Sequence, residues 1–147
     1  MQDSVDAERP PGRRLTRDGR QMPADLDEAL IERVVGAFYL GVRADPLLAP
    51  IFETEIGEDE WDDHLKRMCA FWSSMLLGTG RYDGKPLPAH LAIADLDDRH
   101  FARWLALFHT VTHAVAGPEA ARLFVDRAER VAHSFRLAIA FHRGQNT

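Results

Sequence analysis

Apolar residues recur at intervals of three and four along almost the whole chain after residue 24, as on the buried face of a helix. No stretch alternates apolar and polar residues as a half-buried strand would. This pattern predicts an all-α domain with four substantial helices and several short ones. The long helices are expected from Leu26 to near Asp45, from about residue 59 to residue 77, from Asp97 or Asp98 to near Gly117, and from Pro118 through Ile139, with a short one near 86–92.

Polar residues, glycines and prolines indicate where these helices begin and end. The first helix should end near Asp45, and Asp45-Pro46 would then cap and open a short helix carrying Ile51 and Phe52. Asp97 or Asp98 would cap the third long helix, and Gly117-Pro118 would separate it from the last.

Residues 1–24 differ in composition from the rest of the chain. They contain five arginines, four acidic residues, three prolines and two glycines, and few apolar side chains. We therefore expect a flexible N-terminal extension over residues 1–24 and one domain over residues 25–147. The opening Met1-Gln2-Asp3-Ser4 lacks the apolar run of a secretory signal.

Composition and charge narrow the class of protein further. Apolar residues make up 46% of the chain and charged residues 28%, which is typical of a folded globular protein. No apolar run approaches the roughly 20 residues that span a bilayer, so no membrane insertion is expected. A net charge of −5 argues against nucleic acid as a partner. The single cysteine, Cys69, fits a reducing cytoplasm.

The seven histidines are the side chains best suited to hold a metal. Helical geometry places His133 opposite the apolar stripe of its helix, and His100 at a stripe edge, where we expect exposure or partial exposure. His142 is placed where the last helix ends.

His109 and His113 form an i, i+4 pair that could hold a divalent metal on one helix face. Thr110 stands where zinc proteases carry the glutamate that serves as general base. Because His113 also lies well away from the apolar stripe of Trp104 and Phe108, an ordinary surface pair is favoured over a metal site.

Tyr39, His64 and Trp104 are polar-tipped rings on three different expected helices. His64 falls inside an apolar stripe, so its imidazole needs a hydrogen-bond partner or a ligand, and a satisfied core histidine is the simpler interpretation. If the three rings converge, they form an apolar pocket with hydrogen-bond donors, although periodicity alone does not show that they converge. His90 follows two prolines that stiffen the backbone, and composition alone would leave it an ordinary loop histidine.

Several segments in a fixed order, covering roughly residues 26–140, carry a family resemblance. They are FYLGVRADPLLAPIF (38–52), WDDHL (61–65), FWSSMLLGTGRY (71–82), GKPLPAHL (84–91) and HFARWL (100–105). Together, and above all through the Phe-Trp-Ser-Ser…Gly-Arg-Tyr…His-Leu block, they resemble the group III truncated haemoglobins.

The resemblance implies a truncated globin domain, a shortened two-over-two helical sandwich that encloses haem b (iron protoporphyrin IX). On that template His90 matches the proximal iron ligand. The distal positions that face a bound gas match Tyr39, His64 and Trp104. Side chains that would bury the porphyrin faces are Phe38, Phe71, Trp72, Leu76 and Phe108. Cationic candidates for its propionates are Arg81, Lys85 and Arg103.

The implied ligands are O₂ and, in addition, NO, CO or peroxide, and an unidentified reductase would support any catalytic turnover. A neutral imidazole suits Fe(II) as fifth ligand and leaves the sixth position open. The family usually continues with Leu-Pro after the proximal His-Leu, whereas this chain reads Ala92-Ile93-Ala94, a departure that concerns the end of the proximal helix. The alternative from another class is a haem-free helical module that binds a partner, or a divalent metal through His109 and His113.

Overall fold

The computed structural model describes residues 22–84 and 96–145, and within these ranges the chain forms helices and no strand. The prediction of an all-α fold is therefore confirmed. The helices are α2 (Glu28–Ala44), α3 (Ala49–Glu55), the short 3₁₀ helix η1 (Glu58–Glu60), α4 (Trp61–Leu77), α6 (Asp98–Val115) and α7 (Pro118–Gln145).

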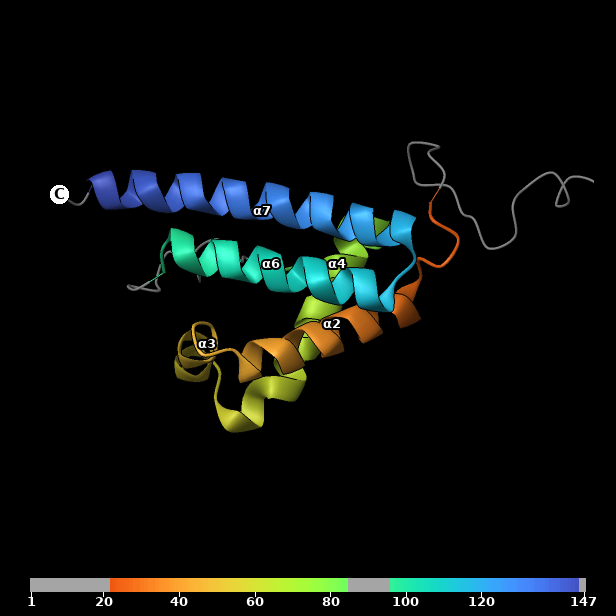
Figure 1. The fold of residues 1–147 in the computed structure, drawn as a ribbon, viewed down its shortest axis with the longest axis horizontal. Helices are drawn as coiled ribbons and strands as arrows, with labels where there is room; N and C mark the ends of the chain where they lie inside the picture. The colour runs from red at the N-terminus through yellow and green to blue at the C-terminus, as the bar shows by residue number, and fades with distance from the viewer. Residues whose placement is uncertain (1–21, 85–95, 146–147) are drawn as a thin grey trace, which may run out of the picture.

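The four long helices form two pairs, α2 with α4 and α6 with α7. Figure 1 shows α7 alongside α6, α2 on the opposite side of α6, and α4 crossing behind. Because α2 packs against both α4 and α6, it joins the two pairs into the two-over-two sandwich expected from the sequence.

Local capping explains where three of the helices begin or end. The Asp27 carboxylate accepts a hydrogen bond from the Leu30 N–H at 2.8 Å and starts α2. Asp97 caps α6 in the same way by accepting from the Arg99 N–H at 2.9 Å, as predicted. Gly78 ends α4 in the left-handed region, with φ of 67°, where a residue without Cβ is least strained.

The short helix after α2 begins later than the sequence pattern predicts. Asp45 and Pro46 do not open it, since α3 starts at Ala49. The Asp45 carboxylate instead accepts from the N–H groups of Leu47 at 3.1 Å and Leu48 at 3.0 Å, and so closes a turn at the end of α2. The carboxylate does cap backbone donors, but those donors belong to the turn that precedes the helix.

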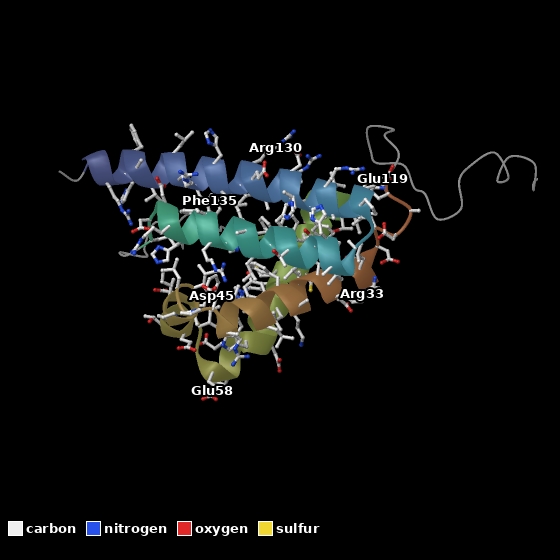
Figure 2. The ribbon with its side chains drawn as sticks, viewed as in Figure 1. Arg33, Asp45, Glu58, Glu119, Arg130 and Phe135 are labelled. Atoms are coloured by element: carbon white, nitrogen blue, oxygen red, sulfur yellow. The ribbon has the colours of Figure 1, made fainter. Side chains whose placement is uncertain are left out.

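The buried side chains gather into a main core around α2 and a smaller one near the start of α6. The main core includes Leu26, Leu30, Ile31, Val34, Val35, Phe38, Val42, Trp72, Leu76, Phe108, Phe124 and Ala128. The smaller core consists of Leu96, Phe101, Ala132 and Ile139, with Phe135 packed against it. Figure 2 shows Phe135 between α7 and α6, where that smaller core lies. Each large side chain buried in this way stabilises the fold by about 1.5–3 kcal/mol.

His100 is buried, with 5% of its surface exposed, so the prediction of an exposed or partly exposed ring is wrong. Its Nδ1 accepts a hydrogen bond from the Asp97 N–H at 3.1 Å. This reciprocal cap folds the ring back over the start of α6 and away from solvent, which the spacing of apolar residues does not reveal.

Two expectations fall wholly or partly on residues outside the described ranges. Met22 is buried in the main core, three residues before the predicted domain start at residue 25. Residues 1–21 and the short helix expected over residues 86–92 lie outside the described part of the chain, so both remain predictions.

Among the described residues, no single helix has both the length and the apolar composition needed to cross a bilayer. The helices α2 and α3 meet that requirement only jointly, across a break where the chain bends by 105°.

Candidate ligand-binding site

Tyr39 of α2 and His64 of α4 lie in edge-to-face contact, with ring centroids 4.9 Å apart and ring planes at 86°. Phe52 of α3 lies 5.8 Å from the Tyr39 ring, and Trp61, at the start of α4, lies 5.7 Å from the His64 ring. Three helices thus bring four rings together. We call Tyr39, Phe52, Trp61 and His64 the polar ring cluster, because a hydroxyl and an imidazole sit among apolar surfaces.

The polar tips of this cluster are largely shielded from water. Burial raises the pKa of Tyr39 above its ordinary value, and the nearby Cys69 raises it further, so the hydroxyl stays protonated and able to donate at neutral pH. Within the described ranges the Tyr39 hydroxyl forms no hydrogen bond. The Nε2 atom of His64 is buried as well. This arrangement leaves a donor available to a small ligand in an apolar setting.

Trp104 is connected to the polar ring cluster through the Phe38 ring, which contacts both Trp104 and Tyr39. Its indole lies edge-on to Phe38 at 5.8 Å and stacks on Phe108 at 5.6 Å, with planes 3° apart. Phe38 in turn contacts Tyr39, with centroids 5.0 Å apart. The structure therefore brings Tyr39 and His64 into direct contact and places Trp104 one ring further away.

A second aromatic group lies deeper in the core. The Trp72 and Phe108 rings stack at 5.1 Å, and Phe124 of α7 contacts Trp72 at 5.4 Å and Phe108 at 6.1 Å. We call Trp72, Phe108 and Phe124 the buried stack, since each has at most 5% of its surface exposed.

The residues expected to line the porphyrin differ in how far protein already covers them. Phe38, Trp72, Leu76 and Phe108 are buried, whereas Phe71 is half-buried. Phe71 belongs to a set of half-buried apolar side chains packed on the main core from α4 and α6, the apolar row, which comprises Leu65, Met68, Phe71, Met75, Trp104 and Leu105. These side chains retain apolar surface that another apolar body could cover.

Two arginines proposed from the sequence for the propionates form ion pairs inside the protein. Arg81 Nη1 lies 2.7 Å from Glu28 Oε2, which also accepts a hydrogen bond from the Ser73 hydroxyl at 2.9 Å. Arg103 Nε donates to Asp45 Oδ1 at 2.6 Å. The third cation, Lys85, and the expected iron ligand, His90, lie outside the described residues.

Asp45 is a residue whose tertiary role the sequence pattern did not identify. Its side chain is 2% exposed and lies where α2, α3 and α6 approach one another (Figure 2). Burial on its own would raise the pKa of this carboxyl, but the Leu48 N–H and the Arg103 guanidinium outweigh burial and hold the pKa below its ordinary value. The ionised pair therefore connects the turn between α2 and α3 to α6, the helix that carries Trp104.

Arg43, in the last turn of α2, lies over the Trp61 ring of the polar ring cluster. Its guanidinium carbon lies 4.6 Å from the centroid of a Trp61 ring, within the range of a cation–π contact. Such a contact holds the Trp61 ring in place beside His64.

The other histidine pair proposed from the sequence lies on the molecular surface. His109 and His113 are both exposed, as expected for a pair on the surface of α6, and exposure by itself does not decide whether the pair binds a metal. Within the described ranges, no group of three or more His, Cys, Asp or Glu side chains is arranged to hold a metal ion.

Comparison with known proteins adds independent information on the family. No family model matches the chain. The chain is 34% identical over 113 residues to a group 3 truncated haemoglobin of Campylobacter jejuni, covering 76% of this chain and 89% of that protein. The crystal structure of the group III truncated haemoglobin from Campylobacter jejuni matches the fold with a TM-score of 0.74 at 34% identity, covering 78% of this chain and 91% of that one.

Proposed function

This chain belongs to the group III truncated haemoglobins, and we propose that it holds haem b and binds O₂ reversibly at an iron ligated by His90. The observation that carries the proposal is the Tyr39–His64 contact. It brings a tyrosine whose hydroxyl stays protonated into edge-to-face contact with an imidazole, and half-buried apolar side chains of α4 and α6 pack on the same core.

The described residues fit a large, flat apolar cofactor. The apolar row, including Phe71, offers apolar surface from α4 and α6, while Phe38, Trp72, Leu76 and Phe108 are buried in the main core on which it packs. Covering that surface stabilises the complex by about 25 cal/mol per Å² of apolar area. Of the cationic side chains, Lys85 and the remaining guanidinium nitrogens of Arg81 and Arg103 are proposed partners for the propionates.

The haem iron, held by a neutral imidazole, would supply an open coordination position for a diatomic gas. The role of His90 rests on the family resemblance and on its place in the GKPLPAHL segment. Around that position the chain contributes donors. The Tyr39 hydroxyl and Trp104 Nε1–H would each hold a bound ligand of partial negative charge by about 1–3 kcal/mol, or roughly 5- to 150-fold in dissociation rate.

Beyond O₂ binding, we propose that the same pocket admits CO and NO and that it supports NO oxidation or reaction with peroxide. Conversion of NO and O₂ to nitrate consumes one electron, so repeated turnover would require a separate reductase. We also propose a cytoplasmic location, in line with the single thiol, Cys69. Steady-state NO consumption in the presence of an added electron donor tests the NO chemistry. Cell fractionation tests the location.

The haem proposal is tested by reconstituting the full chain with haem and recording its absorption spectrum. We expect a Soret band at one haem per chain and reversible spectral changes with O₂ and CO. His90→Gly should lose stable haem incorporation and regain it when imidazole is added, whereas His133→Gly, at an exposed position of α7, should reconstitute normally. Absence of a Soret band in the wild-type chain would overturn the proposal.

A further inference from the structure

We propose that His109 and His113 form a surface binding site for a divalent transition-metal ion, separate from the haem pocket. The two rings lie on consecutive turns of α6 with centroids 4.2 Å apart and planes 21° from parallel. Both side chains are exposed, whereas the adjacent Phe108 and Thr112 are buried. The pair therefore faces away from the main core and is open to ions in solution.

The ring separation is close to what one metal ion requires. Imidazole nitrogens bind Zn²⁺ at about 2.0–2.1 Å, so two of them on the same ion lie roughly 3 Å apart. The rings, with centroids 4.2 Å apart and planes 21° from parallel, are close enough to share an ion, but they must rotate about their side-chain torsions so that both lone pairs converge on it, which exposed side chains can do.

One of the two rings is already in the tautomer that a metal requires. His113 Nδ1 lies 2.9 Å from the backbone oxygen of His109, and because a carbonyl oxygen only accepts, Nδ1 carries the proton. The lone pair of His113 is therefore on Nε2, the outer nitrogen. A ligating histidine ordinarily donates its other N–H to a carbonyl or carboxylate in this way, which fixes its orientation.

The position of the pair on the helix also favours a cation. His113 lies in the last turn of α6, where the unpaired carbonyl groups give the helix end a partial negative charge. Two imidazoles completed by water suit Cu²⁺, Ni²⁺ and Zn²⁺, with affinity expected in the order Cu²⁺ > Ni²⁺ > Zn²⁺. Mg²⁺ and Ca²⁺ prefer oxygen ligands and should not compete.

The experiment is calorimetric titration of the metal-free full chain with Zn²⁺, Ni²⁺ and Cu²⁺ salts, with and without haem. We expect a site for one ion per chain that is present in both forms. His109→Ala and His113→Ala should each weaken binding at least about tenfold, because the second imidazole no longer binds intramolecularly. His133→Ala, also exposed but on α7, is the matched control and should leave the affinity unchanged.

A variant that keeps the number of histidines separates a two-histidine site from general attraction of metals to imidazoles. His113→Ala combined with Ala114→His moves the second ring by about 100° around the helix, so it should bind as weakly as His113→Ala. Circular dichroism checks the fold of each variant, and all the substituted positions are exposed. The proposal would be overturned if the wild type and the His113→Ala/Ala114→His variant bound the metal with equal affinity, or if His133→Ala lost as much affinity as His113→Ala. Because the titration needs no haem, failure of the haem proposal leaves this result interpretable.

Discussion

The buried stack and the polar ring cluster are neighbouring aromatic groups that meet at Phe38, yet they are built differently. Phe38 contacts Phe108 of the stack at 5.1 Å and Tyr39 of the cluster at 5.0 Å. Every ring of the stack is buried, whereas the cluster combines buried Tyr39 and Trp61 with half-buried Phe52 and His64. The difference indicates that the stack serves mainly to stabilise the fold, while the cluster combines partly buried rings with two polar groups, as the proposed ligand pocket would require.

Truncating the centre of the stack tests its contribution most directly. Phe108→Ala should lower the free energy of unfolding by about 3–5 kcal/mol, because it leaves a cavity between Trp72 and Phe124. Urea denaturation of the wild type and the variant measures the change. Phe141→Ala, at a position 67% exposed, is the control and should shift stability by less than about 0.5 kcal/mol. Similar losses of unfolding free energy in Phe108→Ala and Phe141→Ala would show that the buried stack contributes no more to stability than an exposed ring.

A somewhat smaller loss of stability should follow when the Asp45–Arg103 pair, which connects the turn after α2 to α6, is weakened. Asp45→Asn keeps the shape of the side chain but removes the charge that Arg103 and the Leu47 and Leu48 N–H groups stabilise. At pH 7 we expect a loss of about 1.5–3 kcal/mol in the free energy of unfolding.

The sign of the pH dependence follows from the lowered pKa of Asp45. The carboxyl stabilises the wild type fully above its unfolded-state pKa of about 3.9, and this contribution is lost as the pH falls through the lower folded-state value. The difference between wild type and Asp45→Asn should therefore begin to shrink as the pH falls below about 5 and continue to shrink below the unfolded-state pKa. Asp98→Asn, which breaks an exposed pair with Arg136, serves as the control. A difference that stays constant on acidification would contradict this role for the charge.

Within the polar ring cluster, removing one hydroxyl should separate stability from ligand binding. Tyr39→Phe should change the free energy of unfolding by no more than about 1 kcal/mol, because the described protein gives this hydroxyl no hydrogen bond to lose. The O₂ dissociation rate, followed by stopped flow, should rise roughly 5- to 150-fold. Tyr82→Phe, near the end of α4, provides the matched control. An unchanged dissociation rate would remove Tyr39 from the ligand-holding role.

The smallest effect should come from the exposed ion pair between Arg81 and Glu28. Both side chains are nearly half exposed, so Arg81→Gln should cost about 0.2–1 kcal/mol, and less at high salt. If Arg81 also serves the propionates, the variant should release haem faster than Arg99→Gln, which alters another exposed pair. Equal rates of haem release would confine Arg81 to its contact with Glu28.

Much of the fold could be predicted because helix periodicity and caps are local properties. The C-terminal end of α4 follows from Gly78, and the start of α6 follows from Asp97, because both residues act on backbone groups within a few residues. The start of α3 and the burial of His100 were mispredicted. In each case a side chain, that of Asp45 or that of His100, bonds to a backbone group that the apolar pattern does not specify.

By itself, the sequence determined the all-α class, the four long helices with the main apolar stripes that face the core and, through ordered segments of resemblance, the family. Only the tertiary structure decided that Tyr39 touches His64 while Trp104 stands one ring away, and that Arg81 and Arg103 are ion-paired within the protein. The physical reason is one of range. Periodicity fixes the direction of a side chain relative to its own helix axis, but contacts between helices depend on how all the side chains pack at once.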